Sequence, residues 1–259
     1  MSSDTLFDKL IRLQHYGYAT RLLDLTSNVL VALYFASLGN KDKDGELIIL
    51  DIPDSEIKYD DSDVVSILSA ISLRKHNFNI ENYLNISRKY AEIEKEQNEK
   101  ENKKLRESLN YLPSDMREKV ESVLKFSSEG IYKEKFKEIF NKQSEIARLL
   151  HDIRNDKPSF APIIDSNDFN RVVCVYAKMN NPRIIRQHGS FLLFGIDQEK
   201  KNHATVKKEW KQFSKRIIVK KEAKENILKS LKDFGISRQT LFPELDSQAK
   251  DIMEKYQVK

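Results

Sequence analysis

The apolar positions from residue 28 to residue 38 form an almost unbroken run, the clearest feature of the chain. Ser27 or Thr26 can cap a helix at its start, and Gly39 follows its last residue. Because nearly every position is apolar, we predict a helix over residues 28–38 that is covered on most sides. A shorter apolar run at residues 47–50, bounded by turn residues, predicts a buried strand.

The region from residue 54 to residue 150 shows helical spacing of apolar residues around one charged stretch. Residues 94–104 contain no apolar residue, and Glu96 and Lys100 stand at the i,i+4 spacing that supports an exposed helix. We therefore expect a helical insertion over about residues 54–150, in which residues 94–104 are solvated and contribute little to stability. The insertion either binds a protein partner or a second copy, or only covers the core.

The second half of the chain changes to short β-rich runs separated by turn residues. We predict strands at residues 172–176, 183–185, 191–194 and 217–219. Turn signals rather than crossover helices separate these runs, which favours a mixed or mainly antiparallel sheet.

Two helices are predicted after these strands. Residues 222–234 place Ile227, Leu228, Leu231 and Phe234 on one face, and Gly235 ends the helix. A short helix at about residues 246–256 closes the chain. Strands in one block and helices in others predict an α+β fold, with packed helices and a helical insertion, in a single domain of residues 1–259.

The charge of the chain is mixed, with 45 Lys and Arg against 40 Asp and Glu among 259 residues, a net charge of +5. This excess weakly favours anionic partners, and part of it surrounds Trp210 between residues 200 and 221. Basic residues with aromatic residues among them can hold a nucleic-acid strand. The more common alternative is a solvated edge around a strand.

Cys174 is the sole cysteine, so the sequence provides no disulfide framework and no Cys-x-x-Cys metal motif. It lies in a strand-like run, where a buried inert thiol is expected. The N-terminus lacks a signal-peptide pattern, and no run of about 18 apolar residues occurs. We therefore expect a cytoplasmic protein with no membrane partner and no bound metal.

The sequence contains no Gly-rich phosphate loop, Gly-x-Ser-x-Gly elbow or His-Glu-x-x-His motif. This absence argues against the common nucleotide hydrolases, esterases and zinc proteases. The polar residues next to the apolar helix are the remaining candidates for chemistry. Arg21 and Asp24 are expected to pair with each other or to line a site, because charges near a core need partners.

Three motifs in this region resemble a known family. They are Gln-His-Tyr-Gly at residues 14–17, Thr-Arg-Leu-Leu-Asp at residues 20–24 and Ala-Leu-Tyr-Phe-Ala at residues 32–36. The stretch is similar to the FRG domain, a mainly bacterial and phage module, and further matching blocks occur at residues 150–160, 181–191 and 234–245. The Phe-Arg-Gly segment that names the family is absent, so we expect a domain that lacks its N-terminal part.

The order of the family's segments is also distantly similar to that of ADP-ribosyltransferases. In those enzymes an arginine holds the NAD phosphates and a glutamate stabilises the ribosyl cation. Gln187 stands where that carboxylate would be, and a neutral amide cannot supply the same electrostatic stabilisation. The resemblance thus implies an NAD- or nucleotide-directed transferase that is weak or inactive as this chain alone, with NAD as the candidate cofactor.

The candidate site residues are assembled from across the sequence. His15 is a general base, a hydrogen-bond donor or a structural histidine, and Asp24 orients Arg21 rather than acting as a base. Asp152 beside Arg154 more often forms a structural ion pair than a site. The candidate catalytic residues are His15, Arg21 and Gln187, and the candidate cofactor-binding residues are Gln14, Tyr16, Asp24 and Arg183.

From these features we expect an FRG-like intracellular effector or defence-type protein of bacterial or phage origin that binds a nucleotide-like or nucleic-acid ligand. The alternatives are a non-catalytic protein-interaction module and a truncated, inactive copy. A protein partner or a second copy is expected to bind through the missing N-terminal edge or the helical insertion.

Overall fold

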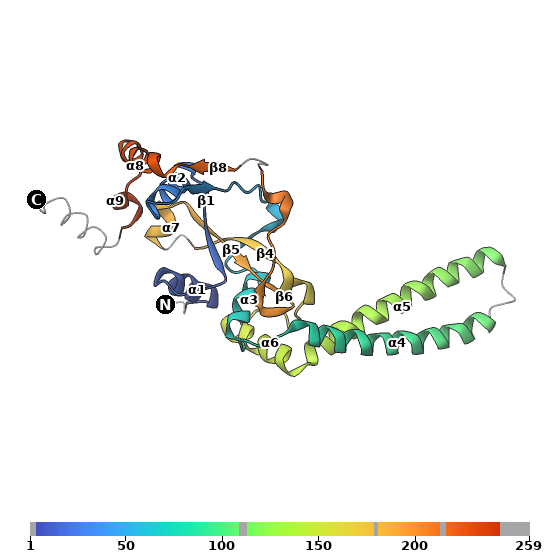
Figure 1. The fold of residues 1–259 in the computed structure, drawn as a ribbon. Coiled ribbons are helices and arrows are strands. Elements are labelled where there is room, and N and C mark those ends of the chain that lie inside the picture. Colours follow the sequence, from blue (N-terminus) through green and yellow to red (C-terminus); the bar gives the residue numbers. More distant parts are fainter. Residues whose placement is uncertain (1–3, 109–112, 179–180, 213–215, 244–259) are drawn as a thin grey trace, which may run out of the picture. The chain divides into compact units, whose positions relative to one another are not determined.

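The computed structural model describes residues 4–108, 113–178, 181–212 and 216–243 (Figure 1). Its helices and mixed sheet form an α+β fold, which confirms the fold class predicted from the sequence. The chain divides into two compact units. The first comprises described residues within 1–65, 172–194 and 205–259, and the second those within 66–171 and 195–204.

A four-stranded sheet forms the centre of the first unit, with strand order β1-β5-β4-β3. The strands are β1 (Leu22–Thr26), β5 (Gly189–Phe194), β4 (Val172–Tyr176) and β3 (Ile57–Tyr59). Both β1 and β4 run antiparallel to β5, whereas β3 runs parallel to β4. The expected mixed sheet and the strand at residues 172–176 are thereby confirmed, while β1 and β3 are strands that the sequence analysis did not predict.

Helix α1 (Leu6–His15) precedes the sheet and was also not predicted. Its start is a capping box, in which the Thr5 hydroxyl accepts from the Asp8 backbone N–H and the Asp8 carboxylate accepts from the Thr5 N–H. Its end leads into Gly17, whose φ of +83° suits a residue without a Cβ. Phe7 packs edge-to-face on Phe191 of β5, so α1 is fixed against the sheet.

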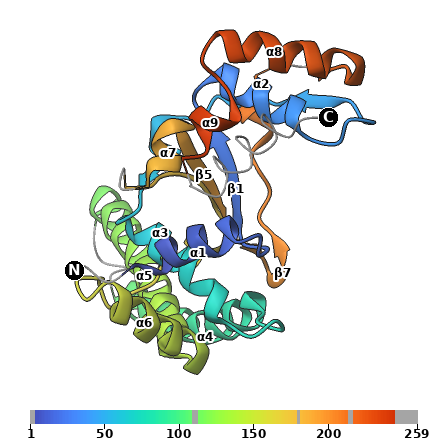
Figure 2. The same cartoon turned by 90° about the vertical axis from the view of Figure 1, so that its left-hand side faces the viewer.

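Helix α2 (Val29–Leu38) confirms the predicted apolar helix, but its cap is Asn28 rather than Ser27 or Thr26. Figure 2 shows α2 beside α8 (Lys224–Asp233). The two helices share a buried cluster of Val31, Tyr34, Leu231 and Leu241. Val29, Phe35 and Leu38 are exposed within the described structure, whereas the other seven residues of α2 are buried or half-buried, which agrees with a helix covered on most sides.

Helix α7 (Pro182–Arg186) replaces the strand predicted at residues 183–185. The Asn181 side chain caps the helix by accepting from the Arg183 N–H at 2.9 Å, and Pro182 occupies its first turn. Proline is favoured there because its missing N–H would have no partner in the helix. This local start signal outweighs the β-branched pair that suggested a strand.

A small two-stranded sheet pairs β2 (Gly45–Leu47) with β8 (Ile217–Val219). The strand expected at residues 47–50 is therefore displaced, and its supposed buried residues Ile48 and Ile49 are exposed. The remaining short elements of this unit are α9 (Arg238–Leu241), η1 (Asp54–Glu56), η4 (Lys208–Trp210) and η5 (Lys221–Ala223).

Of the two helices predicted near the C-terminus, the first lies within the described residues. Helix α8 confirms the helix expected at residues 222–234, and Gly235 ends it with φ of +78°. Phe234, expected on the buried face, is 74% exposed, because it follows the last helical residue rather than belonging to the helix. The helix predicted at residues 246–256 lies outside the described residues.

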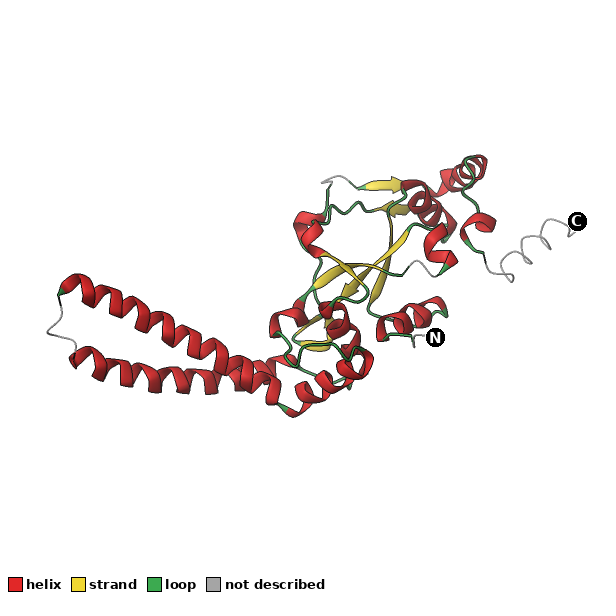
Figure 3. Cartoon of the chain, turned by 180° about the vertical axis from the view of Figure 1, so that it is seen from behind, coloured by secondary structure: helices red, strands yellow, loops and turns green. Residues whose placement is uncertain are grey.

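The second unit is dominated by two long helices, α4 (Ile80–Ser108) and α5 (Ser114–Lys142), which run side by side as a hairpin (Figure 3). It also contains α6 (Ser144–Asp156), η2 (Ile71–Leu73), η3 (Ser166–Asn170), β6 (Ile196–Asp197) and β7 (Glu199–His203). Helix α3 (Asp63–Ala70) spans the boundary between the units. The helical character expected for residues 54–150 is confirmed for residues 63–73, 80–108, 114–142 and 144–150.

The hairpin is joined by polar side chains as well as by apolar ones. The Asn102 amide donates to Asn98 at 2.9 Å and to the Ser128 hydroxyl at 3.1 Å, and that hydroxyl donates to Asn98 at 3.0 Å. Asn102 and Ser128 are both buried. The charged stretch 94–104 therefore packs against α5 through hydrogen bonds, and the expectation that it only faces solvent is wrong.

Candidate functional site

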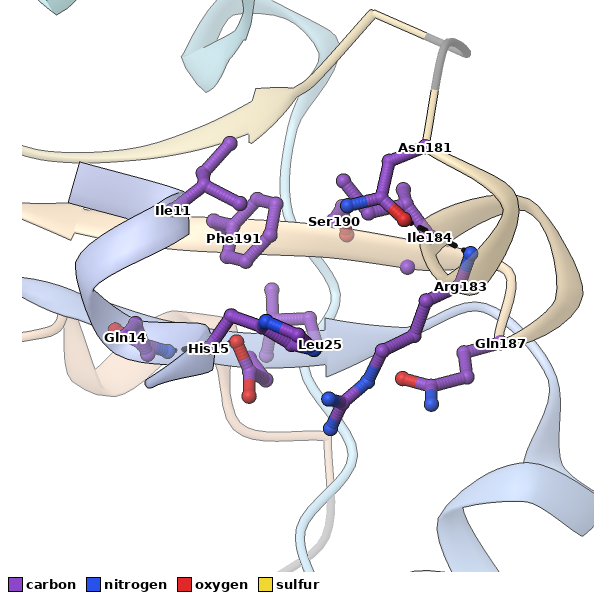
Figure 4. A pocket seen from close by; sticks show the side chains of 12 residues that line it. Ile11, Gln14, His15, Leu25, Asn181, Arg183, Ile184, Gln187, Ser190 and Phe191 are labelled. Atoms are coloured by element: carbon purple, nitrogen blue, oxygen red, sulfur yellow. Dashed lines mark hydrogen bonds between the residues drawn. The ribbon is translucent and has the colours of Figure 1, made fainter. Parts of the chain in front are cut away.

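The first unit contains a small pocket between the end of α1, strands β1 and β5, and helix α7 (Figure 4). Its cavity volume is about 100 Å³. Ile11, Leu25, Ile184 and Phe191 supply apolar walls, and the polar residues Asn181 and Ser190 also line the pocket. Five further polar side chains come from residues that are distant in sequence, namely Gln14, His15, Asp24, Arg183 and Gln187. A concave apolar site with a few convergent polar groups is typical of a ligand pocket.

The Asp24 carboxylate is oriented by a chain of hydrogen bonds. The Leu22 backbone N–H donates to the Thr20 hydroxyl at 3.2 Å, and that hydroxyl donates to the Gln14 side-chain oxygen. The Gln14 amide nitrogen then donates to Asp24 at 2.7 Å. Because the Gln14 oxygen is engaged by Thr20, its amide group is fixed with the nitrogen toward Asp24.

The surroundings of Asp24 include one influence that raises its pKa and two that lower it. Its side chain reaches solvent, yet protein atoms crowd the carboxylate, and this loss of water raises the pKa of Asp24. The hydrogen bond from Gln14 and the positive charge of Arg183 lower the same pKa to a smaller extent. The result is a carboxyl group that takes up a proton more readily than an ordinary aspartate.

Helix α7 positions the other two polar groups of the pocket. In Figure 4 the Arg183 side chain extends toward the space between His15 and Gln187. Its guanidinium lies 4.8 Å from the centre of the Phe242 ring, a cation–π contact that holds the side chain in place. The Gln187 amide nitrogen donates to the Leu241 carbonyl at 3.1 Å, which leaves its side-chain oxygen for a ligand.

The structure therefore brings together five of the seven residues selected from the sequence. Tyr16 and Arg21 do not line the pocket. Tyr16 caps the end of α1 and is 71% exposed, whereas Arg21 is buried, and burial lowers the pKa of its guanidinium. Arg21 lies at a bend directly before β1, whereas Asp24 lies within β1. Arg183, rather than the expected Arg21, supplies the charge that acts on Asp24.

Two residues that complete the site were not predicted from the sequence. Asn181 both caps α7 and lines the pocket, and Thr20 fixes Gln14. An Asn immediately before Pro is a recognisable helix-start signal that could have revealed the first of these. No local pattern identifies Thr20, because its partner is six residues away across a turn.

The other candidate positions have structural roles. Trp210 is 1% exposed, and Lys207 lies over its ring with the Nζ atom 5.8 Å from the ring centre. A buried indole offers no stacking surface to a nucleic-acid base, which supports the alternative of a solvated edge. Asp152 forms an ion pair with Arg74, and burial raises the pKa of the Cys174 thiol, which suits an unreactive core residue.

Within the described residues, no group of three or more His, Cys, Asp or Glu side chains is placed to hold a metal ion. Of the helices that the structure describes, none is sufficiently long and apolar to span a membrane.

Comparison with known proteins identifies one family. No curated protein and no solved structure gives a significant match to the chain. A family model for the FRG domain matches residues 1–45, the segment that contains α1, β1 and α2. Three of the polar pocket residues, Gln14, His15 and Asp24, lie within this match. The FRG resemblance proposed from the sequence motifs is thus confirmed over residues 1–45.

Proposed function

We propose that the pocket of the first unit binds the planar polar group of a nucleotide-like ligand, and that the protein acts as an FRG-type effector through this binding. The arrangement of Asp24 and Arg183 beside apolar walls carries the proposal. A fixed carboxylate accepts hydrogen bonds from ring or amide N–H groups, and a guanidinium donates to phosphate or ribose oxygens.

The size of the pocket limits what can enter. A cavity of about 100 Å³ takes one small ring, such as a nucleobase or the nicotinamide of NAD, but not a whole nucleotide. The sugar and phosphates would lie outside, toward solvent. Phe191 and Ile184 supply apolar contacts for the faces of such a ring, and the Gln187 oxygen accepts from its edge.

Calorimetric titration of the protein with NAD, ATP and short RNA tests this proposal. Arg183→Lys keeps the charge but loses the planar fork, so we expect it to weaken binding about tenfold, or about 1.4 kcal/mol. Arg186→Lys is the matched control, because Arg186 lies on the same helix, is exposed and does not line the pocket. Equal affinities of wild type and both variants, or no binding of any of these ligands to the folded wild type, would contradict the proposal.

One observation favours a second candidate, cleavage of the bond between the ribose and the nicotinamide of NAD, in which nicotinamide leaves and ADP-ribose is transferred to water or to a nucleophile of a target molecule. Such a reaction needs a negative charge near the developing ribosyl cation, and the neutral Gln187 cannot provide it. Asp24 is a carboxylate in the same pocket, next to Gln187 and Arg183. We expect nicotinamide release from NAD to be slow in wild type and lost in Asp24→Asn. Equal rates in both proteins would eliminate this candidate.

A further inference from the structure

A second cavity lies within the second unit and shares no residue with the first pocket. Its volume is about 630 Å³, within the range of cavities that hold small organic molecules. It is lined by the start of α4, the C-terminal half of α5, the 3-10 helix η3 and strand β6. Nothing in the FRG match extends to these elements, which begin after residue 45.

One wall of this cavity is aromatic. Tyr132 and Phe136 are one helical turn apart on α5, and their rings stack with centres 6.3 Å apart and planes 25° apart. Phe136 stacks in turn on the buried Phe140 at 6.2 Å and 7°. Of the rings in the described residues, only Phe136 contacts Tyr132, so the row of rings ends there. A planar ligand ring can extend this row by stacking on Tyr132.

Four exposed polar side chains from η3, β6 and the residue after β6 also line the cavity. Asn167, Asn170, Asp197 and Gln198 all line it. Across the described ranges, none of these four side chains forms a hydrogen bond or ion pair. Amides offer both donors and acceptors, whereas the Asp197 carboxylate only accepts. Together they match the edge of a ring that carries N–H groups.

The charges at the cavity disfavour a phosphate group. The Arg88 guanidinium is already engaged, because it donates to Glu81 at 2.7 Å and to Asn85 at 2.8 Å. Asp197 adds a further negative charge, so the lining as a whole repels anions. This cavity therefore differs in chemistry from the first pocket, where Arg183 is present.

We propose that this cavity binds a nucleobase that carries an exocyclic amine, as in adenosine or cytidine. The base stacks on Tyr132, and its amine donates to the Asp197 carboxylate. The free nucleoside is preferred to its phosphorylated form. This site goes beyond the function proposed for the first pocket and does not depend on it.

Titration of the full chain with adenosine, inosine and AMP tests the proposal by calorimetry. Inosine carries a carbonyl in place of the amine, which would face the Asp197 carboxylate with no proton between them. We expect adenosine to bind at least tenfold more tightly than inosine and more tightly than AMP. Asp197→Asn should remove the preference for adenosine over inosine, because an amide can also donate to the carbonyl. Asp115→Asn, an exposed site on α5 outside the cavity, should behave as wild type.

Two variants of Tyr132 test whether the base stacks on this ring and whether the site is independent of the first pocket. Tyr132→Leu should weaken adenosine binding, whereas Tyr132→Phe should preserve it, and thermal unfolding checks that both variants are folded. Tyr132→Leu should leave NAD binding at the first pocket unchanged, because Tyr132 does not line that pocket. The proposal is overturned if folded wild type does not bind adenosine or cytidine, if inosine binds equally well, or if Asp197→Asn leaves the selectivity intact.

Discussion

At the scale of single residues, the pocket depends on how Asp24 is held. Gln14 is locked by Thr20 and presents an N–H to the carboxylate, while Arg183 faces it from α7. Together they offer a ligand one acceptor and one donor in fixed positions, which is the arrangement that preorganised sites use.

The raised pKa of Asp24 predicts an unusual pH dependence of stability. A carboxyl group whose pKa is higher in the folded state than in the unfolded state stabilises the fold below its unfolded pKa, and this contribution is lost as the pH rises through the folded value. We therefore expect the melting temperature of Asp24→Asn, relative to wild type, to be higher at pH 7 than at pH 3. Asp115→Asn should show no such trend. A relative stability that falls with rising pH would contradict the prediction.

The residues of this pocket show what sequence can and cannot predict. Gln14, His15 and Asp24 are recognisable because they lie in contiguous motifs, and Arg183 and Gln187 because they lie in a second block. Arg21 was expected to belong with them because it is polar and adjacent to Asp24. It is instead buried outside the pocket, at a bend directly before β1, and no local residue pattern marks this placement.

At the scale of elements, Lys224 shows how a buried charge can support a helix end. Its side chain is 5% exposed, and its Nζ atom donates to the Asn40 carbonyl at 3.0 Å, just beyond the end of α2. We expect Lys224→Met to lower the free energy of unfolding by about 1–3 kcal/mol, because the hydrogen bond from a charged donor to the Asn40 carbonyl is lost. Urea denaturation measures this change. The exposed Lys229→Met on the same helix should have little effect, and a similar loss in both variants would contradict the assignment.

The polar contacts of the α4–α5 hairpin give a second prediction at this scale. Ser128→Ala removes the hydroxyl that links Asn98 and Asn102, so we expect the hairpin to lose about 1–3 kcal/mol of stability. Hydrogen exchange along α4 and α5 should speed up accordingly. Ser127→Ala changes the exposed neighbouring serine and serves as the control. Unchanged exchange in Ser128→Ala would show that these hydrogen bonds add nothing.

Elements with a regular apolar pattern or a marked end were predicted from the sequence. A short helix and a strand with a distant partner were not. Strand β4 and helix α8 follow regular apolar patterns, and Gly235 marks where α8 ends. Helix α7 was mistaken for a strand because five residues are too few to establish a helical period. Strand β1 was missed because its partner β5 lies more than 160 residues later in the chain.

At the scale of the whole molecule, each unit has its own core and its own cavity. The buried Arg74 anchors the second unit through ion pairs with Asp152 and with Glu145, the latter at 3.6 Å. The Lys200 side chain of β7 donates to the Ser72 carbonyl at 2.7 Å and also to the Arg74 carbonyl. These hydrogen bonds connect β7 to the backbone at Arg74.

Replacement of Arg74 tests whether this network supports the second unit. Arg74→Met leaves two partly buried carboxylates without their cation, so we expect a loss of about 3 kcal/mol, the low end for a broken buried pair. Hydrogen exchange should report reduced protection within residues 66–171. Arg154→Met, an exposed arginine on α6, is the control. Equal protection in wild type and Arg74→Met would mean that packing alone holds the unit.

The central claim, that the first pocket binds the planar group of a nucleotide-like ligand, is tested most directly by a nuclear magnetic resonance titration of the labelled protein with NAD and ATP. The account predicts saturable shifts of the backbone amides of residues 14–25 and 183–191, which surround the pocket. It also predicts that Arg183→Lys weakens these shifts and that Arg186→Lys does not. No shifts in these segments at millimolar ligand, or shifts that are identical in Arg183→Lys, would contradict it.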